Sequence, residues 1–160
     1  MTDDRQPFVP DSFEVPRALH ADGFRLEPLD AGHNARDHAA WSGSIAHIRA
    51  IPGFDGGGGW PPPEGMSAEA NLADLVRHAR DFAERRAFTY SVVEDTDGGP
   101  AEVIGCLYLH PDRERPRRVR VSSWVRADRA HLDAPLYRAV RAWLRADWPF
   151  DDDRVDYAAR

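Results

Sequence analysis

The 160-residue sequence predicts one α/β (α+β) domain, with a mixed, mostly antiparallel central sheet and helices on both faces. Short stretches rich in Val, Ile, Phe and Tyr, separated by Gly, Pro and Asp, indicate strands. Two longer stretches have apolar residues at helical spacing. The predicted order is β–α–α–β–β–β–α–β, in which hairpin-linked strands precede a strand–helix–strand crossover, and this order favours a mixed sheet covered by helices.

The first part of the chain predicts an arm, a strand and a helix. Residues 1–20 contain prolines that exclude a regular helix, and we expect them to form an N-terminal arm before a single domain over 21–160. A strand is predicted over 23–29. A helix follows over about 35–50, with Asn34 as its cap and an apolar face of Trp41, Ile45 and Ile48.

Residues 52–65 contain four consecutive glycines followed by Trp60 and three prolines, which fit neither helix nor strand. Phe54 and Trp60 give this Gly/Pro loop two aromatic side chains. A loop of this length in a compact domain is usually functional or disordered. Two interpretations stay open: a lid over a substrate, or a plain mobile loop.

The rest of the chain alternates clearly between elements. Ser67 is the predicted N-cap of a helix whose apolar stripe consists of Leu72, Leu75, Val76, Ala79, Phe82 and Ala83. Strands over 87–95 and 101–110 flank the turn 96–100, and a third strand follows over 119–126. An amphipathic helix begins at about residue 134, and a final strand is predicted to follow residue 153.

Composition excludes several classes of function. The net charge is −6 and every basic residue is arginine, which we interpret as coding bias, so nucleic-acid binding has little support. The single cysteine, Cys106, lies in an apolar run and fits a buried core thiol. The scattered histidines show no metal motif, so no metal is expected. The absence of a signal peptide or long apolar run predicts a cytoplasmic protein without a membrane contact.

The ordered elements resemble those of the GNAT acyltransferase superfamily. The phrases that carry the resemblance are GFRLEPL for the first strand, FTYSVVED and VIGCLYLHP for the central hairpin, and SWVRAD for the strand before the last helix. It covers about residues 22–160. It implies an N-acyltransferase that uses acetyl-CoA or a related acyl-CoA as co-substrate, and a small-molecule or protein amine as acceptor.

The resemblance also implies where acyl-CoA would bind. Its pantetheine amides would pair with the backbone of Ser123, Trp124 and Val125, and its pyrophosphate would lie on the loop that opens the last helix. Backbone N–H groups at a helix N-terminus are a natural seat for phosphate. The implied loop residues are Arg129, Ala130, His131, Leu132, Asp133 and Ala134.

This loop departs from the family pattern. Arg129 and Ala134 match it, but Leu132 stands where the pattern has glycine, and leucine does not readily allow a close backbone approach. Asp133 would repel a pyrophosphate. As an alternative to any ligand role, Asp133 is the predicted N-cap of the last helix. Arg129 or His131 could offset its charge.

The second departure concerns the end of the chain. Family members continue into a further helix and two strands, whereas this sequence ends at Arg160, within the expected fifth strand. An exposed final strand predicts a homodimer, because a free strand edge can pair with a second copy. The catalytic acid or base would come from Tyr157, His110 or Tyr137, each of which could equally be a packing or surface residue.

Two functions therefore stay open at the level of sequence. The first is an N-acyltransferase with the Gly/Pro loop over its acceptor. The second is a non-catalytic GNAT-like protein, used for binding or dimerisation, that has lost productive CoA binding. Leu132, Asp133 and the early end favour the second, while the strand–loop–helix frame with Arg129 and Ala134 favours the first.

Overall fold

The computed structural model describes residues 7–55 and 59–160, and in them one six-stranded sheet in the order β1 to β6. Neighbouring strands are antiparallel from β1 to β5, whereas β6 runs parallel to β5. The mixed, mostly antiparallel sheet predicted from the sequence is thereby confirmed. The strands are β1 Leu19–Ala21, β2 Phe24–Pro28, β3 Phe88–Glu94, β4 Glu102–Pro111, β5 Val119–Val125 and β6 Val155–Tyr157.

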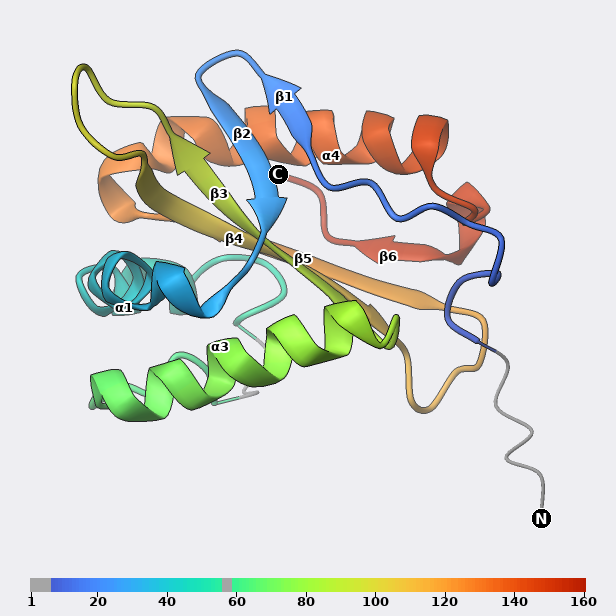
Figure 1. Ribbon diagram of the computed structural model, residues 1–160, viewed down its shortest axis with the longest axis horizontal. Coiled ribbons are helices and arrows are strands. Elements are labelled where there is room, and N and C mark those ends of the chain that lie inside the picture. The colour runs from blue at the N-terminus through green and yellow to red at the C-terminus, as the bar shows by residue number, and fades with distance from the viewer. Residues whose placement is uncertain (1–6, 56–58) are drawn as a thin grey trace.

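Helices cover both faces of the sheet (Figure 1). Helices α1 (Asn34–Ser42), α2 (Ile45–Arg49) and α3 (Ala68–Ala83) pack on one face, and α4 (Asp133–Asp147) packs on the other. A short 3₁₀ segment, Ala127–Leu132, joins β5 to α4. The residues on the two faces are called the α3 face and the α4 face below.

The α4 face is a continuous apolar core. Alternate residues of β3, β4 and β5 meet the apolar stripe of α4 and the residues that follow it. The fully or nearly buried members include Phe88, Tyr90, Leu107, Leu136 and Trp143. Trp41, Trp124, Trp143 and Trp148 are buried, and so is Cys106, as predicted; burial raises the pKa of its thiol.

A β-bulge lies in β4 opposite β3. Val92 pairs with Gly105 but Val93 pairs with Val103, so Ile104 is an extra residue in β4. At Gly105 a Cβ atom would lie 2.2 Å from the carbonyl oxygen of Trp124, which is why only glycine fits there. After the bulge, Cys106 and Tyr108 face α3 while Leu107 and Leu109 face α4.

The N-terminal third differs from the prediction at three points. A short strand β1, not predicted, precedes β2, and Val9 in the arm is buried in the α4-face core. The helix predicted over 35–50 is two helices, separated at Gly43 and Ser44. Asn34 is not the cap, because Asp30 caps a 3₁₀ turn that begins one turn earlier and leads straight into α1.

Helix α3 begins as predicted, with the Ser67 hydroxyl accepting from the Ala70 N–H. Its apolar stripe is only partly buried. Leu75 and Phe82 face the sheet together with Asn71, but Leu72 and Val76 are about two-fifths exposed. The prediction failed for these two because the polar Asn71 takes a place on the inner face, which rotates the helix away from its purely apolar stripe.

The Gly/Pro loop lies against the α3 face. Phe54 and Trp60 pack on the core of that face, and the Trp60 ring contacts Trp41, Trp124 and Tyr108. Three glycines of the loop, residues 56–58, lie outside the described residues, as do residues 1–6 of the predicted arm. Whether the loop acts as a lid stays a prediction.

Among residues 7–55 and 59–160, no helix is long and apolar enough to cross a membrane. The same residues contain no group of three or more His, Cys, Asp or Glu side chains placed to hold a metal ion.

Candidate active site

The most distinctive backbone feature is the end of β5 beside β6. The two strands pair only from Val119↔Val155 to Val121↔Tyr157, whereas β5 continues to Val125. In a strand, the backbone groups of successive residues point to opposite neighbours. Arg126 donates its N–H to Ile104 on β4, and the Ser123 carbonyl accepts from the side chain of Arg160 on the other side.

This alternation decides which backbone groups face away from β4. The residues with the same parity as Ser123 direct their N–H and C=O groups toward the β6 side, and those with the parity of Trp124 direct them toward β4. We call the backbone of Ser123 and Val125 the unpaired β5 edge. Of the three predicted pantetheine-binding positions, Ser123 and Val125 are therefore on this edge, while Trp124 is in register with Cys106 on β4.

The side chains at this edge lie on both faces of the sheet. The Trp124 indole is fully buried on the α3 face, where its Nε1 donates to the Tyr108 hydroxyl at 3.0 Å. The Ser123 hydroxyl is buried on the α4 face and lies 2.5 Å from the hydroxyl of Tyr157. Burial raises the pKa of Tyr157 to about 12, so its phenol keeps its proton at neutral pH and can act as a donor.

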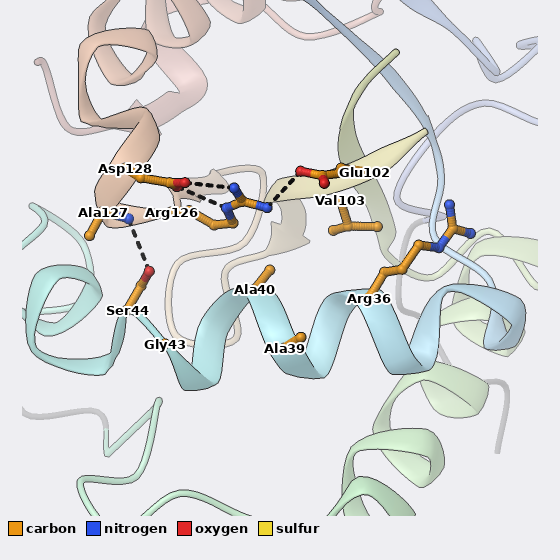
Figure 2. A pocket seen from close by; sticks show the side chains of 10 residues that line it. All are labelled: Arg36, Ala39, Ala40, Gly43, Ser44, Glu102, Val103, Arg126, Ala127 and Asp128. Atoms are coloured by element: carbon orange, nitrogen blue, oxygen red, sulfur yellow. Dashed lines mark hydrogen bonds and ion pairs between the residues drawn. The ribbon is translucent and has the colours of Figure 1, made fainter. Parts of the chain in front are cut away.

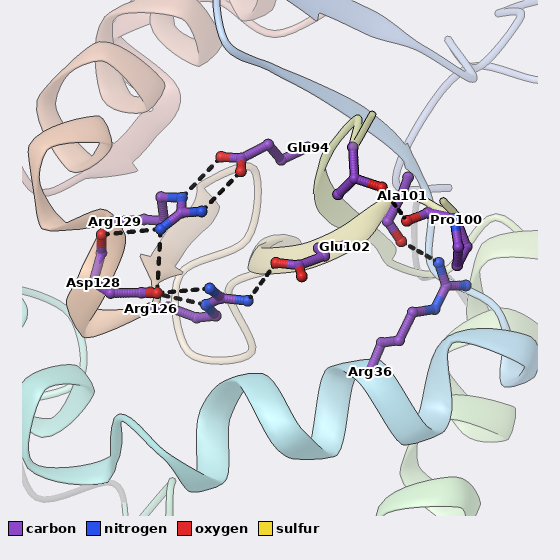
Figure 3. A network of polar contacts seen from close by, with 9 residues as sticks. Arg36, Glu94, Pro100, Ala101, Glu102, Arg126, Asp128 and Arg129 are labelled. Carbon is purple, nitrogen blue, oxygen red and sulfur yellow. Dashed lines mark hydrogen bonds and ion pairs between the residues drawn. The ribbon is translucent and has the colours of Figure 1, made fainter. Parts of the chain in front are cut away.

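The loop after β5 is held from two directions. The Ser44 hydroxyl, at the break between α1 and α2, accepts from the Ala127 N–H at 2.9 Å. The Arg129 guanidinium makes a bidentate pair with Glu94 of β3, with both distances 2.8 Å (Figure 3). This hydrogen-bonded pair lowers the pKa of Glu94 and raises that of Arg129. Arg129, a predicted pyrophosphate ligand, is thus bound to a carboxylate.

Asp133 does not cap the last helix, and that prediction was wrong. It is the first residue of α4, with helical dihedrals of −61° and −49°, and no side-chain capping bond is present. A capping residue needs a non-helical backbone, and here the 3₁₀ segment runs directly into α4. The Asp133 carboxylate instead lies 2.8 Å from the Nε of Arg160.

The other predicted loop residues have no such partners in the described chain. Ala130 and His131 are exposed, and Ala134 is half-buried. Leu132 is partly buried against the α4-face core, so its side chain serves packing rather than a ligand approach. The strand–loop–helix frame is thus present, with Leu132 at the position where the family pattern has glycine.

A cavity of about 320 Å³ lies on the α3 face between α3, β4, β5 and the Gly/Pro loop. We call it the aromatic pocket. The rings of Phe54, Trp60 and Tyr108 contact one another there, with centroid distances of 5.8 to 6.3 Å. The polar residues at the pocket are Asp37, Asn71, Asp74, Arg77, His78, His110 and Ser122.

His110 is the best-placed proton acceptor in the aromatic pocket. Its ring stacks on Tyr108 and lies 6.4 Å from the ring of His78. Burial, and then the neighbouring His78, lower the pKa of His110 to about 4. The imidazole is therefore neutral at physiological pH, and a pKa this low also makes it a weak base.

The two predicted catalytic residues do not come together. His110 lies in the aromatic pocket on the α3 face, and Tyr157 lies in the α4-face core, where it contacts Tyr137 at a ring distance of 4.8 Å. The sheet separates them, and Ser122 and Ser123 are the neighbouring residues of β5 that reach the two sides. Any joint chemistry would have to take place at this point of β5.

A second cavity, of about 430 Å³, lies between α1 and the adjoining ends of β4 and β5 (Figure 2). Three of its charged side chains, Arg126, Asp128 and Glu102, are paired with one another. Arg126 makes a bidentate pair with Asp128 and also bonds Glu102, and Arg36 donates to the Ala101 carbonyl. Arg36 has no carboxylate partner among the described residues, so it is the one cation of this cavity that is not paired with an anion there.

Several residues at the site were missed by the sequence analysis. Ser44 was hidden inside a segment predicted as continuous helix, although the Gly43–Ser44 pair is a plausible signal of a break. Glu94 and Arg160 act through partners 35 and 27 residues away in sequence, to which no local pattern points. His78 was noted only as one of the scattered histidines.

Neither a family model nor a curated protein matches this sequence. Solved structures do resemble it. They include a ribosomal-protein-S5-alanine acetyltransferase from Vibrio fischeri, with a TM-score of 0.57 and 12% identity over 79% of this chain and 66% of that one. The microcin C7 self-immunity acetyltransferase MccE, solved with acetyl-CoA and AMP, gives 0.59 and 11% over 82% and 66%.

A third similar structure is RimL, a ribosomal L7/L12 α-N-protein acetyltransferase solved with coenzyme A. It has a TM-score of 0.58 and 14% identity over 83% of this chain and 69% of that one. The chain spans slightly less than two thirds of the first two proteins. At these identities the likeness concerns the fold, and it agrees with the strand order and the strand–loop–helix frame described above. The chain has the fold of the GNAT acetyltransferases.

Proposed function

We propose that this protein is an N-acyltransferase that transfers an acetyl or related acyl group from acyl-CoA to an amine. The observation that carries the proposal is the unpaired β5 edge, where β6 leaves β5 after Val121 and the Ser123 carbonyl faces the β6 side. A strand edge whose amide and carbonyl groups are not paired with another strand is suited to an extended ligand that contains amides, because such a ligand can pair with it like another strand. Pantetheine is such a ligand.

The acceptor amine would enter the aromatic pocket. Ser122 lines this pocket, and the next residue, Ser123, belongs to the unpaired β5 edge, so the two parts of the site meet at adjacent residues. The rings of Phe54, Trp60 and Tyr108 suit the face of a cationic or apolar acceptor. Whether the acceptor is a small molecule or a protein amine depends on what the Gly/Pro loop admits.

The proton transfers follow from the two environments. The acceptor must lose a proton before its nitrogen attacks the thioester carbonyl carbon. Neutral His110 lines the pocket where it would receive that proton, but its pKa of about 4 makes the imidazole a weak base, so it would pass the proton on to solvent rather than hold it. As the carbon–sulfur bond breaks, the leaving thiolate needs a proton. Tyr157, protonated and bonded to Ser123, is the donor nearest the unpaired edge among the residues predicted for this role.

The phosphate-binding loop fits acyl-CoA less well than the strand edge does. Arg129 is paired with Glu94, Leu132 is a packing residue, and Asp133 places a negative charge at the start of α4. These observations favour the second candidate function, a non-catalytic GNAT-fold protein used for binding or dimerisation. The two candidates differ in whether acyl-CoA binds at all.

Calorimetric titration with acetyl-CoA and free CoA tests the proposal. We expect micromolar to sub-millimolar binding by the wild type, and Leu132→Gly should preserve or strengthen it by allowing closer backbone approach. No heat at millimolar ligand, in the wild type or in Leu132→Gly, would favour the non-catalytic function. In that case the search should turn to protein partners.

Two variants separate the acyl and acceptor halves of the site. Ser122→Trp should fill the aromatic pocket at β5 and abolish turnover of an amine acceptor while leaving CoA affinity within about threefold. His110→Gln should lower kcat by roughly 10²-fold, with the loss decreasing at alkaline pH, where the acceptor amine is already deprotonated. A His110→Gln enzyme with wild-type kcat and pH profile would exclude His110 as the base.

We also propose a cytoplasmic homodimer. Within the described residues, β6 is the last strand of the sheet and pairs with β5 on one side only. An edge of this kind can pair with the same strand of a second copy. Sedimentation equilibrium on the full chain should give twice the monomer mass, and a monomer at every concentration would contradict this.

A further inference from the structure

The strongest unexplained feature of the site is Arg160. Its guanidinium donates to the Ser123 carbonyl at 2.8 Å, lies 2.8 Å from the Asp133 carboxylate and rests over the Tyr157 ring at 5.8 Å. The side chain is only 4% exposed. An arginine without a structural role would remain in water, because burying a cation is unfavourable unless partners compensate for it.

We infer that the Arg160 side chain is a displaceable plug of the acyl-CoA site, retained by Asp133. This inference rests on the proposed function and concerns the regulation of the same site. Arg160 occupies the Ser123 carbonyl, which is the acceptor on the unpaired β5 edge that a pantetheine amide would use. One carbonyl direction cannot hold both donors, so the cofactor and the side chain compete.

The same contact explains the aspartate in the phosphate loop. An acidic residue at the start of α4 disfavours a pyrophosphate, but it provides the carboxylate that a guanidinium needs when it is buried. We therefore interpret Asp133 as the partner that retains Arg160. Its position indicates that the state in which Arg160 covers the Ser123 carbonyl, called the closed state, has a role of its own.

The geometry also indicates that the plug can leave. The Nε of Arg160 and the Asp133 carboxylate are close but not aligned as a hydrogen bond, and neither this Nε nor the Asp133 Oδ1 has a hydrogen-bond partner among the described residues. Buried groups left unsatisfied make the closed state less stable than an ideal ion pair would. The residues that carry Arg160, beyond β6, belong to no helix or strand.

The test compares CoA affinity in four proteins by calorimetry: the wild type, Arg160→Ala, Asp133→Asn with Arg160→Ala, and Arg154→Ala. Arg154 is the matched control, because it removes the same charge six residues earlier while its guanidinium bonds the Arg117 carbonyl away from the site. We expect Arg160→Ala to bind CoA more tightly than the control, and the double variant to gain on the order of 10- to 100-fold. The reason is that CoA binding no longer has to supply the free energy that displaces the Arg160 side chain.

A second readout follows the plug itself. The ¹⁵N–¹H signal of the Arg160 Nε, identified by its loss in Arg160→Ala, should move to the position of a free arginine when CoA is added to the wild type. CoA bound with this signal unchanged, or affinities in both Arg160 variants no better than in Arg154→Ala, would overturn the plug while leaving the proposed acyltransferase intact. If no variant binds CoA, including the double variant, the proposed function fails and the plug with it.

Discussion

The two faces of the sheet differ in what they bury. The α4 face buries an almost purely apolar core that includes Leu136, Trp143 and Leu144. The α3 face buries polar groups between its helices and strands, namely His33, Asp37, Asn71, Thr89 and Ser91. The α4 face stabilises the sheet by apolar packing, and the α3 face holds the aromatic pocket and its titratable groups. Burying those polar groups lowers stability unless each of them has a hydrogen-bond partner.

The polar groups of the α3 face are joined in a network. Asn71 donates to Asp37 at 3.0 Å and to Asn34 at 2.9 Å, and it accepts from the Trp41 indole at 3.0 Å. A separate hydrogen bond of 2.9 Å joins Ser91 of β3 to His33 on the same face. The bonds of Asn71 hold α1 against α3 next to the pocket. Helix α4, by contrast, is held on the sheet by apolar packing.

The largest expected effect comes from truncating the same residue type on the two helices. Leu136→Ala in α4 should lower the free energy of unfolding by about 2–5 kcal/mol, because a fully buried leucine leaves a cavity. Urea denaturation followed by circular dichroism measures the loss. Leu72→Ala in α3, where the side chain is 40% exposed, should cost well under that and serves as the matched control. Equal losses in the two variants would contradict the conclusion that apolar packing stabilises the α4 face more than the α3 face.

A smaller effect is expected in the polar network. Asn71→Ala removes the partner of the buried Trp41 indole and of Asp37, and should cost about 1–3 kcal/mol in the same denaturation experiment. Glu69→Ala, exposed on the same helix, is the control and should change little. A loss below that of the control would show that the network adds no stability.

The smallest effect is a pH dependence of the same face. Burial raises the pKa of Asp37 above its ordinary value, against the opposing hydrogen bond from Asn71 and the charges of His33 and His38. The folded state then holds the proton more tightly than the unfolded state, so this group loses stability as pH rises from the ordinary carboxyl pKa through the raised one. Unfolding free energies of the wild type minus those of Asp37→Asn should fall across that range. A difference that is flat or rises with pH would contradict the assigned direction.

The fold could be predicted because it follows from local patterns. The alternation of apolar and polar residues predicted the strands on either side of the 96–100 turn, and the helical spacing of apolar residues predicted α3 and α4. The residue type of Ser67 predicted the cap of α3. The errors arose where a tertiary partner overrode a local preference. Asn71 lies on the inner face of α3, where the sequence predicted apolar residues. Asp30 forms the cap that was predicted for Asn34. Asp133 was predicted to be a helix cap, and it pairs with Arg160 instead.

The site was less predictable for the same reason. The resemblance pointed to β5 and the loop after it. It could not show that the backbone of Trp124 faces β4 or that Arg129 pairs with Glu94, because both depend on strand neighbours far away in sequence. His110 lies on the strand before β5 and Tyr157 on the strand after it, but the sequence pattern did not show that their side chains lie on opposite faces of the sheet. The contact between Arg160 and Ser123 had no sequence signal at all.

The bulge at Ile104 has a consequence for how this protein tolerates changes in length. In uninterrupted alternation from Val103, the side chains of Leu107 and Leu109 would face the aromatic pocket, and those of Tyr108 and His110 would face the apolar core. The extra residue inverts that arrangement. Deleting Ile104 would place Gly105 directly after Val103, which removes the bulge and leaves Leu107 and Tyr108 on their present faces. Pairing β4 without a bulge while Ile104 is retained would instead exchange the lining of the pocket for the lining of the core, so β4 should tolerate the loss of this one residue better than a flattening of its bulge.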